Sequence, residues 1–206
     1  MYRSGGNGMM SGLKLKSLKT SCLLVSISVV FLCKLVGTAM AYEEPKYELI
    51  KSTAIYEIRK YGDRLAVQTI QNFGENKAFG RLFRYISGAN QSSSKIAMTI
   101  PVTQSDAESG MAMHFFLPSN YTKETAPLPN ATNVTLVTVP GGYYAVIKYS
   151  GRSTDANFRN HAQMLNEALY KDGIQTLRRP IKATYNGPLT PFFLRRNEAM
   201  YQVEWK

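Results

Sequence analysis

The sequence predicts an α+β fold in which two similar halves build one curved antiparallel sheet or barrel, with a helix outside each half. Three observations indicate this fold. Several short segments alternate apolar and polar residues as half-buried strands do, two segments have the apolar period of an amphipathic helix, and the order strand, strand, helix, strand, strand occurs twice. A cleft between such halves is the expected place for a ligand.

Alternation predicts the strands of the first half, and two of them are joined by the short Gly62-Asp63 turn, which favours an antiparallel hairpin. The last strand of this half is apolar on both sides and is therefore expected in the interior. The predicted strands cover residues 47–50, 55–61, 65–70, 96–102 and 111–117.

The helix of the first half ends before Gly88 and separates two kinds of side chain. At about 100° per residue, one set shares a face expected to enter the core, and a basic set lies on the opposite face, expected to stay in solvent. The apolar set is Phe79, Leu82, Phe83 and Ile86, and the basic set is Lys77, Arg81 and Arg84.

A loop rich in Pro, Ser, Asn and Thr, residues 118–133, divides the halves. The second half then repeats the pattern. A hairpin turns at Pro140-Gly141-Gly142, and a helix over Asp155–Lys171 carries Phe158, Ala162, Leu165 and Leu169 on one face. The predicted strands of this half are residues 134–139, 143–149, 181–185 and 198–205.

Residues 1–41 are expected to be a signal peptide that is removed, leaving a domain over residues 42–206. The segment holds basic residues but no acidic one, then an apolar run from Cys22 to Cys33, and it ends in Ala39-Met40-Ala41, a pattern that signal peptidases accept. The apolar run is about a dozen residues long, whereas a membrane span needs roughly 20. We therefore expect an exported protein, periplasmic or secreted, without a stable membrane span after cleavage.

Composition narrows the class of the exported domain. Five of the 25 Lys and Arg residues and none of the 14 Asp and Glu residues lie before residue 42, so the domain carries 20 basic against 14 acidic residues, a net charge of +6. The basic residues are scattered, which does not indicate a nucleic-acid-binding surface. Both cysteines lie in the signal segment, so packing rather than a disulfide must stabilise the domain.

No nucleophile elbow, phosphate-binding loop or zinc-protease motif occurs, so the sequence offers no catalytic residues by motif. His114 and His161 are the only histidines, which excludes a histidine-rich metal site. His114 lies on an apolar strand and is expected to be a core histidine bonded to a backbone carbonyl. His161 lies at the edge of the second helix's apolar stripe, where it serves either as a structural residue or as a ligand.

Some side chains have a structural and a binding interpretation, and the sequence leaves both open. The basic set Lys77, Arg81 and Arg84 is either solvated or positioned to pair with the carboxylates of an anionic ligand. Met98 is either core filler or a thioether beside a flat ligand. Phe192 belongs to an apolar and basic loop, residues 188–198, of the kind that often carries binding groups.

Four segments resemble the SOUL / haem-binding protein family, and the resemblance runs from about residue 42 to residue 205. The strand that ends Met-Thr-Ile-Pro-Val-Thr is its most specific part. These segments are Tyr56-Glu-Ile-Arg-Lys-Tyr-Gly62, Lys95-Ile-Ala-Met-Thr-Ile-Pro-Val-Thr103, the stretch Gly142 to Gly151, and Arg195-Arg-Asn-Glu198.

The resemblance implies a distorted β-barrel of two pseudo-symmetric halves flanked by two helices. It also implies reversible, non-covalent binding of haem or another tetrapyrrole in a shallow apolar cleft beside the first helix and a late loop, with basic residues at the propionates. By position it nominates Lys77, Arg81, Arg84, Met98 and Phe192. Where some members have a histidine proposed as the iron ligand, this chain has Lys60, so either the iron has no strong protein ligand, or His161 or a methionine substitutes, or haem is not the natural ligand.

Sequestration or transport of a small tetrapyrrole is thus the function that the sequence favours, without catalysis. Two alternatives stay open. One is a hydrolase acting on small lipophilic compounds, with Glu57 and Glu198 as the possible acids. The other is a module that binds a protein partner and no small ligand.

Overall fold

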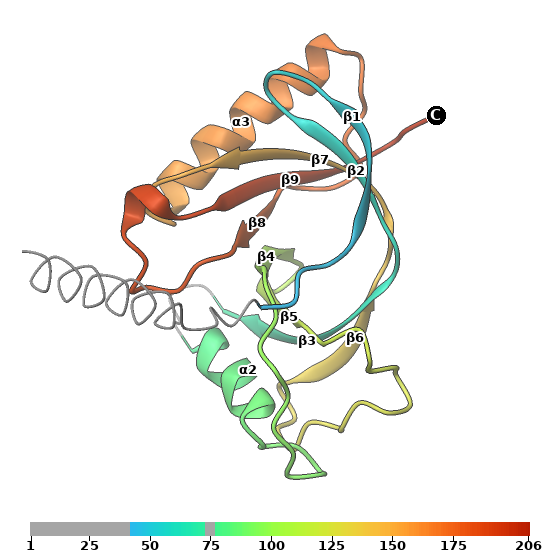
Figure 1. The fold of residues 1–206 in the computed structure, drawn as a ribbon, viewed down its shortest axis with the longest axis vertical. Helices are drawn as coiled ribbons and strands as arrows, with labels where there is room; N and C mark the ends of the chain where they lie inside the picture. The colour runs from blue at the N-terminus through green and yellow to red at the C-terminus, as the bar shows by residue number, and fades with distance from the viewer. Residues whose placement is uncertain (1–41, 73–76) are drawn as a thin grey trace, which may run out of the picture. The chain divides into compact units, whose positions relative to one another are not determined.

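The computed structural model describes residues 42–72 and 77–206; the predicted signal peptide lies outside them. Within the described residues nine antiparallel strands form one curled sheet in the order β1-β2-β7-β9-β8-β4-β5-β3-β6 (Figure 1). The strands are β1 (Tyr47–Ser52), β2 (Glu57–Tyr61), β3 (Arg64–Gln71), β4 (Val102–Ala107), β5 (Gly110–Phe116), β6 (Thr135–Val139), β7 (Gly142–Tyr149), β8 (Ile181–Thr184) and β9 (Asn197–Val203). The predicted α+β distorted barrel is confirmed.

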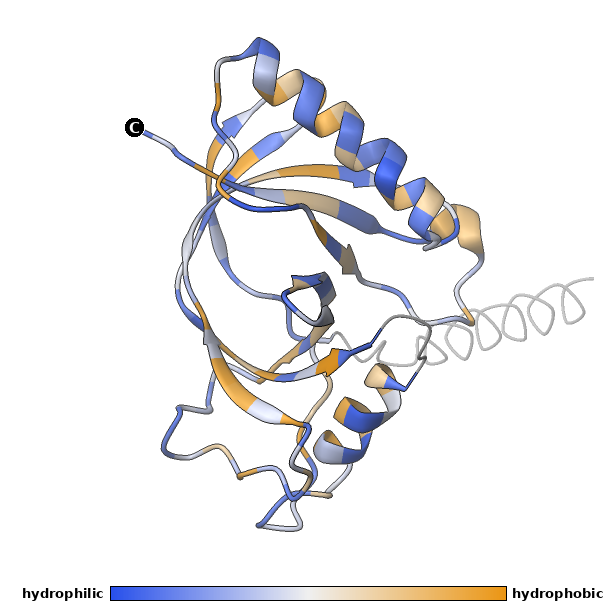
Figure 2. Ribbon diagram, turned by 180° about the vertical axis from the view of Figure 1, so that it is seen from behind, coloured by the Kyte–Doolittle hydropathy of each residue, from blue (hydrophilic) through white to orange (hydrophobic). Residues whose placement is uncertain are grey.

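Two helices cover the convex face of the sheet. Helix α2 (Ala78–Ile86) packs on β3 and β5, and α3 (Asp155–Lys171) packs on β7 and β9 (Figure 1). Hydrophilic and hydrophobic residues alternate along α3, as expected of a helix with one buried side (Figure 2). The Thr154 side chain accepts a hydrogen bond from the backbone N–H of Asn157, which caps the first turn of α3.

The predicted repeat is confirmed by the strand pairings. The first copy is β2-β3-α2-β4-β5 and the second is β6-β7-α3-β8-β9, with β1 added at one edge. Each pairing of one copy has an equivalent in the other: β2–β7 corresponds to β6–β3, β3–β5 to β7–β9, and β4–β5 to β8–β9. The β4–β8 pair joins the two copies at the centre of the sheet.

The two predicted hairpins are wrong, although their strands exist. Strand β2 pairs with β7 and β3 pairs with β6, so the connections at Gly62-Asp63 and Pro140-Gly141 are corners between distant parts of the sheet. The corners touch, because the Asp63 Oδ1 accepts a 2.7 Å hydrogen bond from the Gly141 N–H. A Cβ on Gly141 would lie 2.5 Å from the Tyr61 carbonyl oxygen, so only glycine allows this approach.

The buried strand predicted over residues 96–102 is also wrong. The chain there is irregular, and β4 begins only at Val102, after Pro101, which has no N–H to donate to a ladder. Backbone bonds from Ile96 to Ile86 and from Ile100 to Glu43 hold the segment instead. The segment therefore crosses under α2 as a connector and not as a sheet strand.

The face of α2 that meets the sheet is rotated from the predicted one. Its buried residues are Ala78, Leu82, Tyr85 and Ile86. Tyr85 is drawn inward because its hydroxyl donates to the Pro127 carbonyl at 2.8 Å. Phe79 and Phe83 are consequently 49% and 50% exposed, which corrects their assignment to the core.

Replacing Gly141 with alanine should lower the free energy of unfolding by about 1–3 kcal/mol, because the corner cannot admit a methyl group without moving backbone. Gly80→Ala is the matched control. A Cβ at Gly80 meets nothing within 4 Å, so alanine in this helix should stabilise by about 0.5–1 kcal/mol. Urea unfolding of both variants measures the difference, and an equal effect of the two changes would contradict the close approach of the corners.

Candidate functional site

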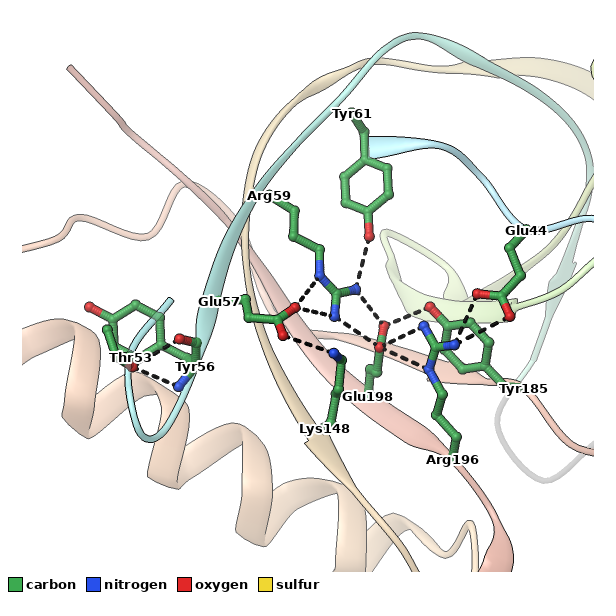
Figure 3. Close-up of polar contacts among 10 residues, drawn as sticks. All are labelled: Glu44, Thr53, Tyr56, Glu57, Arg59, Tyr61, Lys148, Tyr185, Arg196 and Glu198. Atoms are coloured by element: carbon green, nitrogen blue, oxygen red, sulfur yellow. Dashed lines mark hydrogen bonds and ion pairs between the residues drawn. The ribbon is translucent and has the colours of Figure 1, made fainter. Parts of the chain in front are cut away.

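The concave face of the sheet carries polar and aromatic side chains. Arg59 on β2 and Glu198 on β9 lie on either side of β7, and both side chains are fully buried. The Arg59 guanidinium donates to the two Glu198 carboxylate oxygens at 3.1 and 3.2 Å and to the Tyr61 hydroxyl at 3.1 Å (Figure 3). Although burial disfavours the charge, the Glu198 carboxylate raises the pKa of Arg59 above its ordinary value.

Further partners complete this interior network. The Tyr185 hydroxyl donates to Glu198 at 2.6 Å, and Arg196 donates to the same carboxylate at 3.1 and 3.2 Å (Figure 3). Burial, followed by the Glu198 charge, raises the pKa of Tyr185. Glu198 thus accepts from two guanidinium groups and one phenol, which is the compensation that a buried carboxylate requires.

Glu57 is held in the same way at the edge of the network. It accepts from Arg59 at 2.8 Å and from Lys148 at 2.8 Å (Figure 3). Burial opposes the charged form, yet the bonds to Lys148 and Arg59 outweigh it and lower the pKa of Glu57. The two acids considered for hydrolysis are therefore occupied by cationic partners, an arrangement typical of a structural ion network.

A cavity of about 990 Å³ opens beside this network. Four rings form apolar walls, namely Tyr61, Phe116, Tyr144 and Tyr185. The remaining lining consists of small side chains on β4, β5 and β6, polar groups such as Gln68 and Thr103, and exposed charged residues at the rim. Its size is that of a site for one small organic ligand.

Arg64 is the cationic side chain nearest the corner of β2 and β3, and it lines the cavity. Its guanidinium lies between two rings, 4.6 Å from the Tyr61 centroid and 4.3 Å from the Phe116 centroid. Among the residues that the structure describes, no acceptor bonds its buried Nε and no carboxylate pairs with it. Burial lowers the pKa of the Arg64 guanidinium. A smaller hollow of about 520 Å³ also borders Arg64 and Phe116.

His114 lines the same cavity and is not the core histidine that the sequence predicted. Its Nε2 is 2.8 Å from the Gln68 side-chain Oε1 and not bonded to a backbone carbonyl. Burial, assisted by the nearby Arg64 charge, lowers the pKa of His114 to about 4, so the imidazole is neutral near pH 7.

The basic residues nominated from the sequence lie on or beside α2, outside the cavity. Lys77 and Arg84 are exposed, whereas Arg81 donates to the Ile70 carbonyl at 3.0 Å and to the Thr69 hydroxyl at 3.3 Å. The rings of Phe79 and Phe83 stack at 6.1 Å with an interplanar angle of 13°. Helix α2 thus exposes an aromatic pair on one side and basic side chains on another, and we call these four exposed residues the α2 surface: Lys77, Phe79, Phe83 and Arg84.

The other nominated residues are distributed over three elements. Met98 is half-buried in the cluster under α2. Phe192 is exposed in the short 3-10 helix η1 (Phe192–Leu194), with the Arg152 guanidinium 5.3 Å from its ring. His161 on α3 stacks on Tyr149 at 4.1 Å, and its Nδ1 is 2.8 Å from the Asn157 carbonyl oxygen, as in a structural histidine. None of the six nominated residues lines the large cavity.

Lys60, the residue at which the resemblance left the iron ligand open, is exposed on β2 with its Nζ 5.7 Å from the Tyr143 centroid. It faces away from the interior network, because its neighbours Arg59 and Tyr61 point inward. Residues 42–72 and 77–206 contain no group of three or more His, Cys, Asp or Glu side chains that could hold a metal ion. In the same residues, no helix has the length and apolar character to cross a membrane.

The sequence predicted a cleft between the halves, but none of the residues nominated from it lines the cavity, and Arg64 was missed. One signal was present in the sequence. Arg64 follows a two-residue turn and alternates along β3 with Ala66 and Gln68, so these three side chains share one face of the strand and a cation lies on the face that points inward. The second signal, the pairing of β3 with β6, is not visible in the sequence.

Comparisons with known proteins agree with this fold. The family model described as SOUL heme-binding protein matches residues 42–202. The crystal structure of the EcmrR C-terminal domain has a TM-score of 0.55 and 14% identity, over 78% of this chain and 99% of that chain. A crystal structure of a hydrolase from Listeria innocua has a TM-score of 0.53 and 10% identity, over 75% of this chain and 94% of that chain. No curated protein matches the sequence. At these identities the structural likeness shows the fold alone.

Glu198→Ala should lower the free energy of unfolding by about 3–5 kcal/mol, because it leaves Arg59 buried without its main counter-charge. Asp106→Ala is the control, since it breaks the exposed pair with Arg179 and should cost at most about 1 kcal/mol. Denaturant titration of both variants measures this. Equal small losses would show that the interior network does not stabilise the barrel.

Stability should rise with pH between about 4 and 6.5 through His114. In this window the unfolded chain binds a proton on His114 and the folded chain does not, because the folded pKa is lowered to about 4. The His114→Gln variant should therefore lose less stability than the natural chain when the pH falls from 7 to 5. Thermal melts at both pH values test this, and identical losses would contradict the neutral, partly buried imidazole.

Proposed function

The chain belongs to the SOUL heme-binding protein family, and from this membership we propose that it binds haem or another tetrapyrrole reversibly and without a covalent link. The proposed role is sequestration or transport and not chemical conversion. The observation that carries the proposal for this chain is the α2 surface, in which one short helix exposes a stacked aromatic pair on one side and basic side chains on another.

The α2 surface fits the two chemical halves of a tetrapyrrole. Phe79 and Phe83 leave about half of their area in solvent, which is costly for adjacent phenyl rings unless a ligand covers them. Phe79 is supported from below by the buried Phe115, whose centroid lies 5.1 Å away, so the pair rests on the core. Lys77 and Arg84 supply cations for carboxylates at the edge of the ring system.

The loop around η1 supplies a second exposed apolar group. Phe192, Phe193 and Leu194 are 48%, 64% and 66% exposed. The η1 loop lies beside the start of α3, where the Gly151 N–H donates to the Phe192 carbonyl at 3.0 Å, and α2 lies in the other half of the curled sheet, at the same open edge (Figures 1 and 2). We infer that the α2 surface forms one wall of the tetrapyrrole site and that the η1 loop forms the other.

The residues present fit the ring and its carboxylates, and the proposal assigns no protein ligand to iron. Lys60 is on a different part of the sheet, and His161 already uses Nδ1 on α3. A bound tetrapyrrole supplies a flat apolar surface and acidic side arms, and the chain's own contribution is to cover the one and neutralise the other. Metal-free protoporphyrin should therefore bind nearly as well as hemin.

The proposal also includes export of the protein. The acid-free, basic and then apolar segment before Ala39-Met40-Ala41 supports a signal peptide and a periplasmic or secreted carrier. The domain that remains has no cysteine.

Hemin and protoporphyrin IX should each bind the 42–206 domain saturably, in the micromolar range or tighter. Hemin binding is followed by the Soret shift and protoporphyrin binding by quenching of Tyr and Trp fluorescence. No saturable signal with either ligand would refute the proposed function. Strong binding of hemin without binding of protoporphyrin IX would indicate a protein–iron bond and contradict this part of the proposal.

The double variant Lys77→Glu/Arg84→Glu should weaken binding about tenfold or more, because it places like charges beside the ligand's carboxylates. Arg81 is left intact, since its bonds to β3 make its loss a structural change. Arg159→Glu, at an exposed residue of α3, is the matched charge control and should leave the affinity unchanged. If both variants bind alike, the α2 surface is not the site.

A further inference from the structure

The two halves of the barrel are filled differently on the concave face. Strand β2 ends at Tyr61 and β6 ends at Val139, and each corner has two residues before the next strand, so the ends of these strands are equivalent positions. Stepping back two residues along each strand, to the next side chain on the same face, makes Val137 the counterpart of Arg59. The cationic member of the interior network thus has an apolar counterpart.

The same holds for its partners. Ala66 pairs with Phe116, and the equivalent Tyr144 pairs with Gln202, so Phe116 and Gln202 correspond. Four residues before Phe116 on β5 is Ala112, and four residues before Gln202 on β9 is Glu198. Both steps stay on the same face of the strand, so Ala112 is the counterpart of Glu198.

Four bulky groups of the network therefore have small counterparts. Tyr185 and Ala107 also correspond. The Tyr185 N–H donates to the Arg196 carbonyl, just before β9, and Ala107 pairs in the same way with Gly110 at the start of β5. The replaced residues are Arg59, Tyr61, Tyr185 and Glu198, and their counterparts are Val137, Val139, Ala107 and Ala112. All four counterparts line the large cavity, so it occupies the space that the network fills in the other half.

The charge of this cavity is unbalanced at its inner end. At the rim Arg179 pairs with Asp106 at 3.0 Å, and both are exposed. At the inner end Arg64 has the Tyr144 hydroxyl beside it but no carboxylate partner among the described residues, and its Nε is buried without an acceptor. His114 nearby is neutral near pH 7. A buried donor on a charged group without an acceptor is costly, and an anionic ligand would satisfy it.

We propose that this cavity is a second ligand site, which binds a small aromatic carboxylate with its carboxylate on Arg64 and its ring among Tyr61, Phe116 and Tyr144. The site is separate from the α2 surface, and the inference goes beyond tetrapyrrole binding and does not depend on it.

The chain itself shows that this chemistry fits. In the other half the equivalent space holds a carboxylate on a guanidinium, Glu198 on Arg59, with the ring of Tyr185 beside it. A ligand with one carboxylate and one ring system supplies the same groups to the half that lacks them. A cationic ligand group beside Arg64 is disfavoured, because the guanidinium is held between two rings and the two like charges would repel.

The cavity volume agrees with a ligand of this class. At about 990 Å³ it lies at the upper end of the usual range for small-molecule pockets. Gln68 and Thr103 add polar groups to the lining, which allows the ligand further hydrogen bonds.

The test uses 2-naphthoate and its neutral isostere 2-naphthamide, each titrated into the 42–206 domain by calorimetry. The acid should bind saturably and about tenfold or more tightly than the amide, because only the acid makes a charge-assisted bond to Arg64. No binding of the acid in the millimolar range, or equal affinities for the acid and the amide, would overturn the proposal.

Two variants locate the site. Arg64→Met keeps the length and the apolar stem but removes the charge, so it should abolish the preference for the acid. Val137→Phe places a ring in the cavity and should weaken binding of both compounds. Circular dichroism verifies that the variants are folded, and the comparison of acid with amide on the natural chain decides the question if either variant fails to fold.

Arg84→Gln is the control for charge on the α2 surface and should leave naphthoate binding unchanged. Hemin affinity, measured on the same Arg64→Met protein, should also be unchanged. If Arg84→Gln weakens naphthoate as much as Arg64→Met does, the anion binds outside the cavity and the proposal fails. If hemin binding fails while naphthoate binds as described, only the tetrapyrrole function is lost.

Discussion

The buried pair of Arg59 and Glu198 is the constraint on which the interior of this barrel depends. Two opposite charges without solvent exposure are tolerated only when every donor and acceptor is used, and here the phenols of Tyr61 and Tyr185 and the guanidinium of Arg196 complete the set. The network joins β2 to β9 across β7, and Arg196 extends it to Glu44 at 2.9 Å, before β1. One half of the concave face is thereby closed by the protein itself.

The other half shows what the duplicated fold provides when these residues are absent. Val137 and Ala112 stand in place of the pair, and the freed space becomes a cavity in which Arg64 lies between two rings. The convex side offers a different chemistry, because the rotation of α2 leaves Phe79 and Phe83 in solvent on a helix that also exposes Lys77 and Arg84. An exposed surface suits a large flat ligand, and a cavity suits a small one.

Much of the fold could be predicted because its signals are local. The second helix was predicted at Asp155–Lys171, where it is found, since its apolar period and the turn after Lys171 are both visible in the sequence. Strand pairing could not be predicted in the same way, because a two-residue connection such as Gly62-Asp63 serves a hairpin and a corner equally well. The wrong strand at residues 96–102 arose because an apolar run is compatible with a buried connector. Arg64 was missed because its importance depends on tertiary neighbours from β2 and β5.

The central claim is that a tetrapyrrole is held on the convex side, by the α2 surface and the η1 loop. Amide chemical shifts of the ¹⁵N-labelled 42–206 domain, recorded during titration with diamagnetic gallium protoporphyrin IX, test it most directly. Saturable shifts should be concentrated in Ala78–Ile86 and Phe192–Leu194, with the cavity residues of β5 and β6 unchanged. Shifts confined to β5, β6 and the residues around Arg64, or no saturable shift at all, would contradict it.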